Sequence, residues 1–267
     1  MSAESKQKII GVALGVCIVC SILVSTAAVS LNAIQQRNKK LDKIKNILQA
    51  GNLMDKGSNF KEIYDKYIEG AIINLETGEE LPKDEYPDGL TVEEFDIKKV
   101  ANSPELGKSI PSSSDIAQIK RMPKYMSVYF VREEGEIKEI ILPIYGKGLW
   151  STMYGFIALG ADLRTIEGFT FYEHGETPGL GGEVDNPSWK KSWQGKKAFG
   201  EDWNVKIEVL KGRVDPTSDK ANYQIDGLSG STLTTRGVDN LVKFWLGNNG
   251  YSPFLERLRE ESNYDKI

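Results

Sequence analysis

The sequence has few of the side chains that bind transition metals or assist nucleophiles. Its 267 residues include one histidine, His174, and two cysteines, Cys17 and Cys20. A zinc centre or an iron–sulfur site held by this chain alone needs more soft ligands than that, so the two cysteines supply at most half of a metal site shared with a partner. A Ser-His-Asp hydrolase would have to use His174, and no G-x-S-x-G motif accompanies it. We therefore expect no catalytic residue and no metal site on this chain.

An excess of basic residues is also missing. Lys and Arg total 34 against 38 Asp and Glu, which gives a net charge of −4, and no basic stripe alternates with aromatic residues. A mildly acidic chain of this kind is a poor ligand for a nucleic-acid backbone, so we expect no nucleic-acid partner. With 40% apolar and 27% charged residues, the composition excludes a disordered chain and a membrane protein of many spans.

One long apolar run lies near the N-terminus. Residues 9–31 contain no charge and follow a short tail, residues 1–8. A helix of that length spans about 34 Å, enough for a hydrocarbon core of about 30 Å, whereas a cleaved signal peptide has an apolar region of about 7–15 residues. The run predicts a single transmembrane helix in contact with membrane lipid. Ala27 and Ala28 keep a cleaved signal sequence as the alternative.

Positive charge flanks this run unequally. Two lysines precede it, and five basic residues follow it at positions 37, 39, 40, 43 and 45. The positive-inside rule, counted in this way, places the large C-terminal part in the cytoplasm. The rule is weaker for long translocated domains, so the charge count does not decide the orientation alone.

The patterns beyond the run indicate an α+β fold. Residues 32–125 read as a membrane-proximal region, helical to about residue 51 and irregular over 80–112, with a strand at 71–75. From residue 126, apolar alternation predicts strand pairs at 128–132 with 137–145 and at 153–159 with 165–172, then a strand at 205–214 and helices at 187–194 and 232–246. Antiparallel pairs with separate helices are typical of the α+β class. We expect one domain over 126–257 and a C-terminal tail over 258–267.

A hydroxyl-rich segment precedes the expected helix at 232–246. Five of the seven residues from 229 to 235 are Ser or Thr, and Gly227 and Gly230 lie among them. The N-terminus of a helix leaves backbone N–H groups free and binds phosphate, while glycine lets a ligand approach the backbone. Ordinary N-capping by Ser or Thr explains the same composition. The segment is not a P-loop, because no GxxxxGK[ST] pattern is present.

Two further glycine-dense segments lie at strand ends. His174–Glu183 holds four glycines in ten residues, and Tyr145–Ser151 combines two glycines with Trp150. Such loops could enclose a flat ring system, or they could be tight turns without a ligand. Together with the hydroxyl-rich segment they suit a planar cofactor that carries a phosphate, although the spacing does not name it.

These segments, taken together, resemble a known family. SGST at Ser229–Thr232 is similar to the S-G-A-T flavinylation motif, in which the last Thr carries FMN through a phosphoester bond. GETPGLGGE at 175–183, GKGLWSTMYGF at 146–156 and FWLGNNGYSPFL at 244–255 resemble the C subunit of the sodium-translocating NADH:quinone oxidoreductase. The resemblance covers essentially the whole chain and is weakest over residues 50–125.

The resemblance implies one covalent FMN on Thr232, held by the domain at 126–257. Thr232 would be an attachment point and not a catalytic nucleophile. Ser231 departs from the family, which usually has Ala there, and it offers a second hydroxyl beside the acceptor. The residues that the resemblance implies as further FMN contacts are Ser229, Gly230, Ser231, Thr234, Glu176, Thr177, Gly179, Leu180, Gly181, Gly148 and Leu149.

The resemblance also implies a function and a location. A member of this family relays electrons through its FMN while the complex takes electrons from NADH, reduces ubiquinone and exports sodium. Its expected partners are the other subunits of the complex and a flavin transferase that attaches the FMN. The expected location is the cell inner membrane, with the large domain on the periplasmic side, against the charge count.

Two alternatives remain open on the sequence. The G subunit of the Rnf ferredoxin:NAD complex shares the membrane anchor and an S-G-A-T type motif. A membrane-anchored partner-binding protein without a cofactor would also suit the amphipathic stretch after the anchor and the irregular segment at 80–112.

Overall fold

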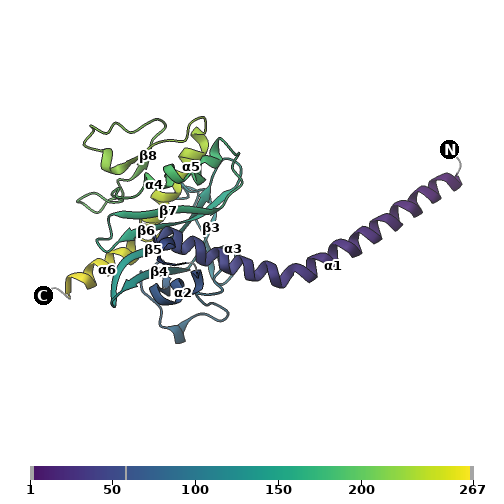
Figure 1. Ribbon diagram of the computed structural model, residues 1–267, viewed down its shortest axis with the longest axis horizontal. Coiled ribbons are helices and arrows are strands. Elements are labelled where there is room, and N and C mark those ends of the chain that lie inside the picture. The colour runs from purple at the N-terminus through teal and green to yellow at the C-terminus, as the bar shows by residue number, and fades with distance from the viewer. Residues whose placement is uncertain (1–2, 58, 265–267) are drawn as a thin grey trace. The chain divides into compact units, whose positions relative to one another are not determined.

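The computed structural model describes residues 3–57 and 59–264, and its contacts divide the chain into two units, one that ends at Lys43 and one that begins at Ile44. In chain order the elements are α1 (Ala3–Ala50), η1 (Met54–Lys56), α2 (Phe60–Tyr67), β1 (Ile68–Asn74), η2 (Lys83–Glu85), α3 (Ile97–Asn102), β2 (Gly107–Ser109), β3 (Arg121–Pro123), β4 (Tyr125–Glu133), β5 (Glu136–Lys147), β6 (Thr152–Gly160), β7 (Ile166–Glu173), η3 (Gly181–Asp185), α4 (Pro187–Lys191), β8 (Glu208–Val209), η4 (Ala221–Tyr223), β9 (Gln224–Ile225), α5 (Thr232–Leu246) and α6 (Ser252–Tyr264). Figure 1 shows them along the chain.

Helix α1 contains the apolar run. Its segment Lys6–Ala50 is long and apolar enough to cross a membrane, by length and composition. Apolar side chains from Ile9 to Val29 are more than half exposed in the chain by itself, as expected of a surface that contacts lipid. The helix continues without a break through residues 32–50, as predicted, and its last turns belong to the second unit, where Ile47 and Leu48 are buried.

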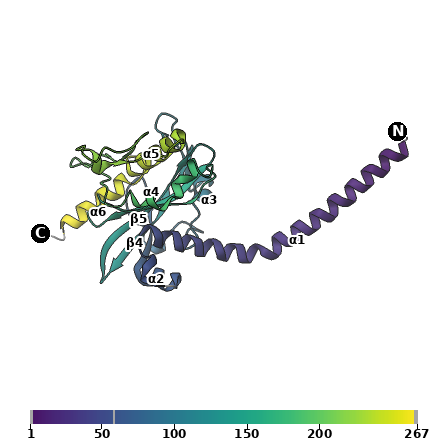
Figure 2. The same cartoon turned by 45° about the horizontal axis from the view of Figure 1, so that its top comes forward.

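The second unit is built on one five-stranded antiparallel sheet with the order β1-β4-β5-β6-β7. The predicted strand pairs β4–β5 and β6–β7 are present, and Figure 2 shows β4 and β5 side by side. Strand β1 pairs with β4 although residues 75–124 separate the two strands in the sequence, and Ile72 lies opposite Ser127. The segment between β1 and β4 leaves the sheet and contains α3 and the two-stranded β2–β3 pair. The α+β class is confirmed.

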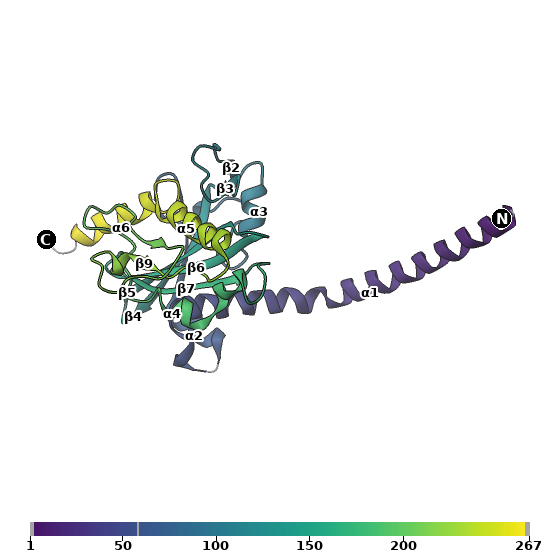
Figure 3. The ribbon, with the colours of Figure 1, turned by 90° about the horizontal axis from the view of Figure 1, so that it is seen from above.

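Helical segments cover both faces of the sheet. On one face, a Cβ added at Gly51, just beyond α1, would lie 2.9 Å from Ile141 of β5. On the other face, a Cβ at Gly146 of β5 would lie 2.4 Å from Leu241 of α5, and Trp245 of α5 donates a hydrogen bond to the Tyr145 carbonyl at 2.6 Å. Figure 3 shows α5 lying across the strands. This close packing fixes the start of α5 against the end of β5.

Two elements are shorter than the sequence predicts. The strand expected at 205–214 is reduced to β8, which pairs in parallel with the equally short β9, and Val209 N–H donates a hydrogen bond to Asp239 of α5 at 2.9 Å. The helix expected at 187–194 ends at Lys191, and Gly195 follows with a φ of +80°. The strand is as short as the partner it pairs with, whereas the helix ends shortly before a glycine in the left-handed region.

The boundaries at the two ends of the domain also differ. Most of the expected tail at 258–267 continues α6, which starts at Ser252-Pro253, a favourable helix start. Residues 265–267 of that tail, and residues 1–2 of the expected tail at 1–8, lie outside the described residues. The second unit begins well before residue 126, since β1 belongs to its sheet.

Glu139 of β5 has a half-buried side chain on the face that contacts Gly51. Its Oε2 atom has no hydrogen-bond partner within residues 3–57 and 59–264, and a Cβ at Gly51 would lie 3.7 Å from that atom. Burial raises the pKa of Glu139 to about 8, helped by the carboxylates of Glu167 and Glu133 and opposed by Lys56. The native state therefore keeps this carboxyl protonated at pH values where the unfolded chain ionises it.

The raised pKa of Glu139 predicts that the stability of the fold depends on pH. Stability falls as pH rises from about 4.5, the ordinary pKa, to about 8, the folded pKa, because only the unfolded state gains the charge. Glu139→Gln removes the ionisation, so we expect its melting temperature to exceed that of the wild type at pH 8, by about 2–4 °C for each kcal/mol recovered, and to match it near pH 5. Thermal unfolding of the detergent-solubilised chain at both pH values measures this. Glu136→Gln, on the exposed start of β5, is the control, and an equal shift in both variants contradicts the prediction.

Candidate functional site

Three segments that are distant in sequence meet at one end of the sheet. Residues 148–151 connect β5 to β6, residues 174–183 follow β7, and Thr232 begins α5. These are the three glycine- and hydroxyl-rich segments that the sequence singles out. β6 is antiparallel to both β5 and β7, so β5 and β7 run in the same direction. Their C-terminal ends therefore lie at the same end of the sheet.

The carboxylate of Glu176 joins all three segments. Its side chain is buried, with 5% of its surface exposed. Oε1 accepts hydrogen bonds from the backbone N–H groups of Trp150 at 3.0 Å and Ser151 at 3.3 Å. Oε2 accepts from Leu149 N–H at 3.1 Å and from the Thr234 hydroxyl of α5 at 2.6 Å. One buried side chain thus ties the β5–β6 loop and the first turn of α5 to the loop after β7.

These hydrogen bonds keep Glu176 ionised. Burial by itself raises the pKa of Glu176, but the bonds from Thr234 and from the backbone of Trp150, Leu149 and Ser151 outweigh it, so the pKa lies below its ordinary value. A carboxylate that accepts several N–H and O–H bonds is stabilised in its charged form. Glu176 is thus an ionised group that stabilises the structure, and it does not serve as a base.

Two glycines allow this close arrangement. A Cβ at Gly148 would lie 2.5 Å from Glu176 Oε1, and a Cβ at Gly181 would lie 2.6 Å from the Thr234 hydroxyl. Both distances are too short for any side chain, so the loops approach the carboxylate only because these positions are glycine. Gly148, Gly181, Leu149, Glu176 and Thr234 are all predicted from the sequence as cofactor contacts, and the structure brings them into one cluster.

The hydroxyl groups at the start of α5 have different environments. Thr234 and Thr235 are buried, and the Thr235 hydroxyl accepts a hydrogen bond from Leu228 N–H at 3.0 Å. Ser231 occupies the N-cap position and is 7% exposed, but its side chain makes no capping bond to this helix, which lies wholly in the described part of the chain. Thr232 is exposed at the first position of α5. Ordinary capping by Ser231 therefore does not explain the segment.

Exposed apolar side chains surround the start of α5. Leu149 and Trp150 from the β5–β6 loop are 39% and 66% exposed, Leu180 from the loop after β7 is 45% exposed, and Leu233 beside Thr232 is 53% exposed. A Cβ at Gly230 would lie 3.1 Å from Leu180, which places that leucine next to the SGST segment. These four side chains offer apolar surface around the start of α5.

Hydrogen bonds within the loop after β7 also fix its conformation. The Thr177 carbonyl accepts hydrogen bonds from Leu180 N–H at 3.1 Å and Gly182 N–H at 2.9 Å, and Gly179 between them has a φ of +75°. The His174 ring accepts from Glu176 N–H through Nδ1 at 3.2 Å and lies 2.7 Å from Asp185 through Nε2. His174 thus serves as a hydrogen-bonded support for the loop.

The remaining residues predicted as cofactor or metal ligands are exposed or lie outside the cluster around Glu176. Ser229 and Gly230 lie on the surface at the turn before α5. Cys17 and Cys20 are free, exposed side chains of α1 in the first unit. Over residues 3–57 and 59–264, no three His, Cys, Asp or Glu side chains form a group that could hold a metal ion.

The sequence does not reveal the role of the backbone of Trp150 and Ser151. Their N–H groups are two of the four donors to Glu176. Every residue except proline has a backbone N–H group, so the sequence does not show which of them donate. The Ser151 hydroxyl, which accepts a hydrogen bond from Gly175 N–H at 2.6 Å, is also absent from the predicted contacts. Its place directly after the Gly148-Leu149-Trp150 turn is the only signal that points to it.

Comparisons with known proteins agree with this geometry. The family described as FMN-binding domain matches residues 148–247. The chain is 45% identical to the C subunit of the Na(+)-translocating NADH-quinone reductase of Pseudomonas aeruginosa over 260 residues, which cover 96% of this chain and 97% of the relative. It is 40% identical to the C subunit of the same enzyme of Vibrio alginolyticus, with 96% of each chain covered.

Solved structures give the same result. The crystal structure of NqrC from Shewanella oneidensis superposes with a TM-score of 0.75 at 32% identity, covering 84% of this chain and 99% of that chain. The C subunit of the Na(+)-translocating NADH-quinone reductase from Parabacteroides distasonis superposes with a TM-score of 0.60 at 28% identity, covering 84% and 96%. These relatives favour the predicted resemblance over the alternative of an Rnf-type complex.

The cluster predicts a stability cost for losing the Glu176 charge. Glu176→Gln replaces one carboxylate oxygen by an amide that cannot accept a hydrogen bond, so a backbone N–H loses its partner. We expect the free energy of unfolding to fall by about 1–3 kcal/mol at pH 7. Because the folded pKa lies below the ordinary value, the wild-type advantage is present above about pH 4.5 and is lost as pH falls through the folded pKa.

Denaturant unfolding at pH 7 and at pH 3.5 measures this difference. Glu183→Gln is the matched control, since Glu183 lies in the same loop and only accepts a hydrogen bond from Asn186 at 2.9 Å. Equal stability of Glu176→Gln and Glu183→Gln at pH 7 would show that the carboxylate does not hold the three segments together.

Proposed function

The chain belongs to the family of the C subunit of the Na+-translocating NADH-quinone reductase, and on that premise we propose that it relays electrons through one FMN attached covalently to Thr232 by a phosphoester. As a member of this family it is part of an oxidoreductase complex and carries an FMN-binding domain. The relay is coupled, in this proposal, to the reduction of ubiquinone by NADH and to the export of sodium.

The observation that carries the proposal is the placement of Thr232. Its hydroxyl is exposed at the N-terminus of α5, where free backbone N–H groups and the positive end of the helix favour a phosphate. Two residues further on, Thr234 binds Glu176 and so joins this helix start to the other two loops. A phosphate on Thr232 therefore has both a favourable electrostatic environment and a fixed position relative to the loops.

The surrounding residues fit the rest of the group. Leu149, Leu180 and Leu233 offer exposed apolar surface for a planar ring, and Gly148 and Gly181 keep the loop backbones close together. FMN supplies the redox chemistry when it is bound, while the chain holds and orients it. In this proposal the residues that line the cofactor are Ser229, Gly230, Ser231, Thr234, Glu176, Thr177, Gly179, Leu180, Gly181, Gly148 and Leu149, within a domain of residues 126–257.

The ionised Glu176 carries its own consequence for the cofactor. It is a fixed negative charge whose two oxygens accept four hydrogen bonds, three from the β5–β6 loop and one from Thr234 of α5. Losing that charge would loosen Thr234 and the β5–β6 loop together. Glu176 is therefore a positioning residue and not a catalytic one.

The proposal includes the membrane and the partners. Helix α1 anchors the chain by a single pass through the cell inner membrane, with residues 9–31 in contact with lipid and residues 1–8 as a short tail. The FMN domain lies on the periplasmic side, where a flavin transferase attaches the cofactor. The unequal positive charge around the run favours the opposite side, but that rule weakens for long translocated domains. Other subunits of the complex supply the NADH site.

The proposal predicts the behaviour of two adjacent variants. Thr232→Ala removes the exposed hydroxyl and nothing that the loops depend on, so the chain should fold normally and carry no covalent flavin when it is expressed with a flavin transferase. Ser231→Ala, which restores the residue usual in the family, should keep the full amount. In-gel fluorescence of the denatured chain measures covalent flavin, and circular dichroism checks folding.

The outcomes are distinct. Flavin retained on folded Thr232→Ala, or lost from Ser231→Ala, would contradict attachment at Thr232. Absence of covalent flavin from the wild type in cells with a working transferase would favour the cofactor-free, partner-binding alternative.

A further inference from the structure

A cavity of about 660 Å³ lies beside the loop that contacts Glu176. One wall comes from the excursion between β1 and β4, through Lys98, Asn102 and the segment 112–121, and the other from β5 and β6, through Tyr145, Lys147, Thr152 and Tyr154. The FMN-binding family covers only residues 148–247, so the excursion lies outside it. The volume is in the range of small-molecule sites, about 300–1,000 Å³. The proposed flavin site does not use it.

The lining is rich in positive charge. Lys98, Lys120, Arg121 and Lys147 line the cavity, against one carboxylate, Asp115. Two of these cations are already engaged. Arg121 donates to the carbonyls of Ala101 and Ser103, at 3.0 and 3.1 Å, and Lys98 forms an ion pair with Glu173.

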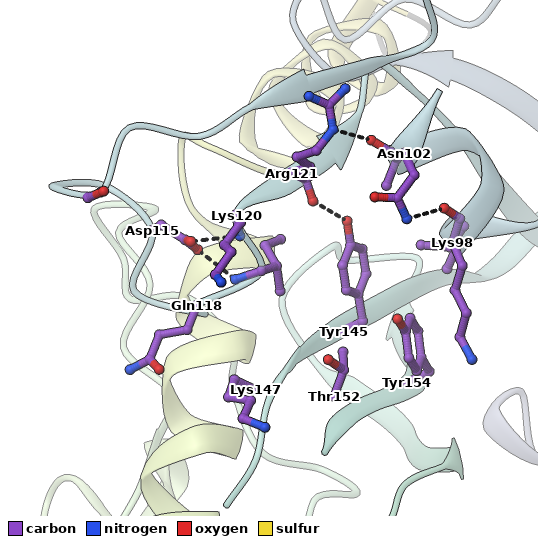
Figure 4. A pocket seen from close by; sticks show the side chains of 14 residues that line it. Lys98, Asn102, Asp115, Gln118, Lys120, Arg121, Tyr145, Lys147, Thr152 and Tyr154 are labelled. Atoms are coloured by element: carbon purple, nitrogen blue, oxygen red, sulfur yellow. Dashed lines mark hydrogen bonds between the residues drawn. The ribbon is translucent and has the colours of Figure 1, made fainter. Parts of the chain in front are cut away.

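Lys120 and Lys147 are the cations that remain for a ligand. The Lys120 ammonium has no hydrogen-bond or ion-pair partner within the described residues 3–57 and 59–264. Among the same described residues, the Lys147 ammonium donates only to the Trp150 carbonyl, at 3.1 Å. Figure 4 shows Lys120 and Lys147 on the same side of the cavity, together with the Gln118 side chain. Two cations and an amide therefore line this side of the cavity.

Asp115 holds the backbone of the segment that carries Gln118 and Lys120. Its two oxygens accept the backbone N–H groups of Ile119 at 2.9 Å and Lys120 at 2.8 Å. Gln118 and Lys120 adopt left-handed backbone conformations, with φ of +53° and +62°. Such conformations in residues other than glycine persist only where surrounding contacts enforce them. The strained segment presents both side chains to the cavity.

We propose that this cavity binds a small oxyanion with two or more negative charges, carried by phosphate or carboxylate groups, between Lys120 and Lys147 with help from the Gln118 amide. An anion of this kind pairs with the two ammonium groups and replaces the water around them. The lining keeps a net positive charge, because it has four cationic side chains and one carboxylate.

The site is connected to the cluster around Glu176. The Lys147 ammonium holds the Trp150 carbonyl, and the Trp150 N–H donates to Glu176 at 3.0 Å. Lys147 N–H also donates to the Ala117 carbonyl at 2.8 Å, which joins the strained segment to the end of β5. An anion that draws the Lys147 ammonium away from Trp150 releases one support of the loop at 148–151. Anion binding is thus coupled to the mobility of that loop.

Isothermal titration calorimetry tests the binding. The full chain carrying Thr232→Ala, in neutral detergent at low ionic strength, is titrated with inorganic phosphate and, separately, with citrate. Because this chain lacks the proposed flavin attachment, a failure of the flavin proposal does not affect the result. We expect saturable binding with 1:1 stoichiometry of at least one probe, weakened about tenfold by Lys120→Gln and by Lys147→Gln, the loss of one charge-assisted hydrogen bond.

Lys138→Gln on exposed β5 is the matched control and should bind like the parent. The probe that binds more tightly distinguishes a phosphate ligand from a carboxylate ligand. A Kd of 1 mM corresponds to a binding free energy of about −4 kcal/mol. Failure of both probes to show saturable binding up to about ten times that concentration would overturn the proposal. Equal weakening by all three lysine variants would overturn it as well, since it would show general charge attraction.

Amide hydrogen exchange of the peptide at 146–153 tests the coupling. We expect faster exchange in the presence of the binding probe in the parent chain and no change in Lys147→Gln. Binding without any change in exchange would overturn the coupling to the loop. Circular dichroism of each variant ensures that a lost response does not come from unfolding.

Discussion

A buried carboxylate fixes the positions of three loops that are far apart in the sequence. Glu176 receives four hydrogen bonds, from the turn between β5 and β6 and from the first turn of α5. The same carboxylate would be unfavourable in this place without those donors, because burial alone raises its pKa. The arrangement around Thr232 therefore depends on a charge that the protein itself has to stabilise, and not on the hydroxyl-rich segment alone.

The sheet provides the framework that lets these groups meet. Adjacent antiparallel strands bring the ends of β5 and β7 to one edge, and α5 lies against β5 closely enough that Gly146 and Gly237 leave no room for a side chain. The excursion between β1 and β4 adds a second layer at the same edge, where Lys147 lines a cavity and also contacts the loop that binds Glu176. An apolar surface for a ring, a helix start for a phosphate and a cationic cavity thus share one end of the domain.

The sequence predicts the parts of this arrangement that depend on local patterns. The apolar stripe and the hydroxyl-rich start predict α5 at its observed bounds, and the glycine-dense segments point to Gly148, Glu176 and Gly181, which the structure brings together. It does not predict the donors to Glu176, because three of the four are backbone N–H groups, those of Leu149, Trp150 and Ser151. Nor does it predict the pairing of β1 with β4 or the shortening of the strand at 205–214 to β8, since both depend on which strand the tertiary fold supplies as a partner.

Mapping the modified residue in the wild-type chain decides whether the start of α5 carries the cofactor. The chain is expressed with a flavin transferase, digested, and analysed by tandem mass spectrometry for a peptide heavier by one FMN less one water. We expect a single modified peptide with the added mass on Thr232, the exposed first residue of α5. Added mass on Ser229 or Ser231, or a fully unmodified chain from cells with an active transferase, would contradict attachment at Thr232.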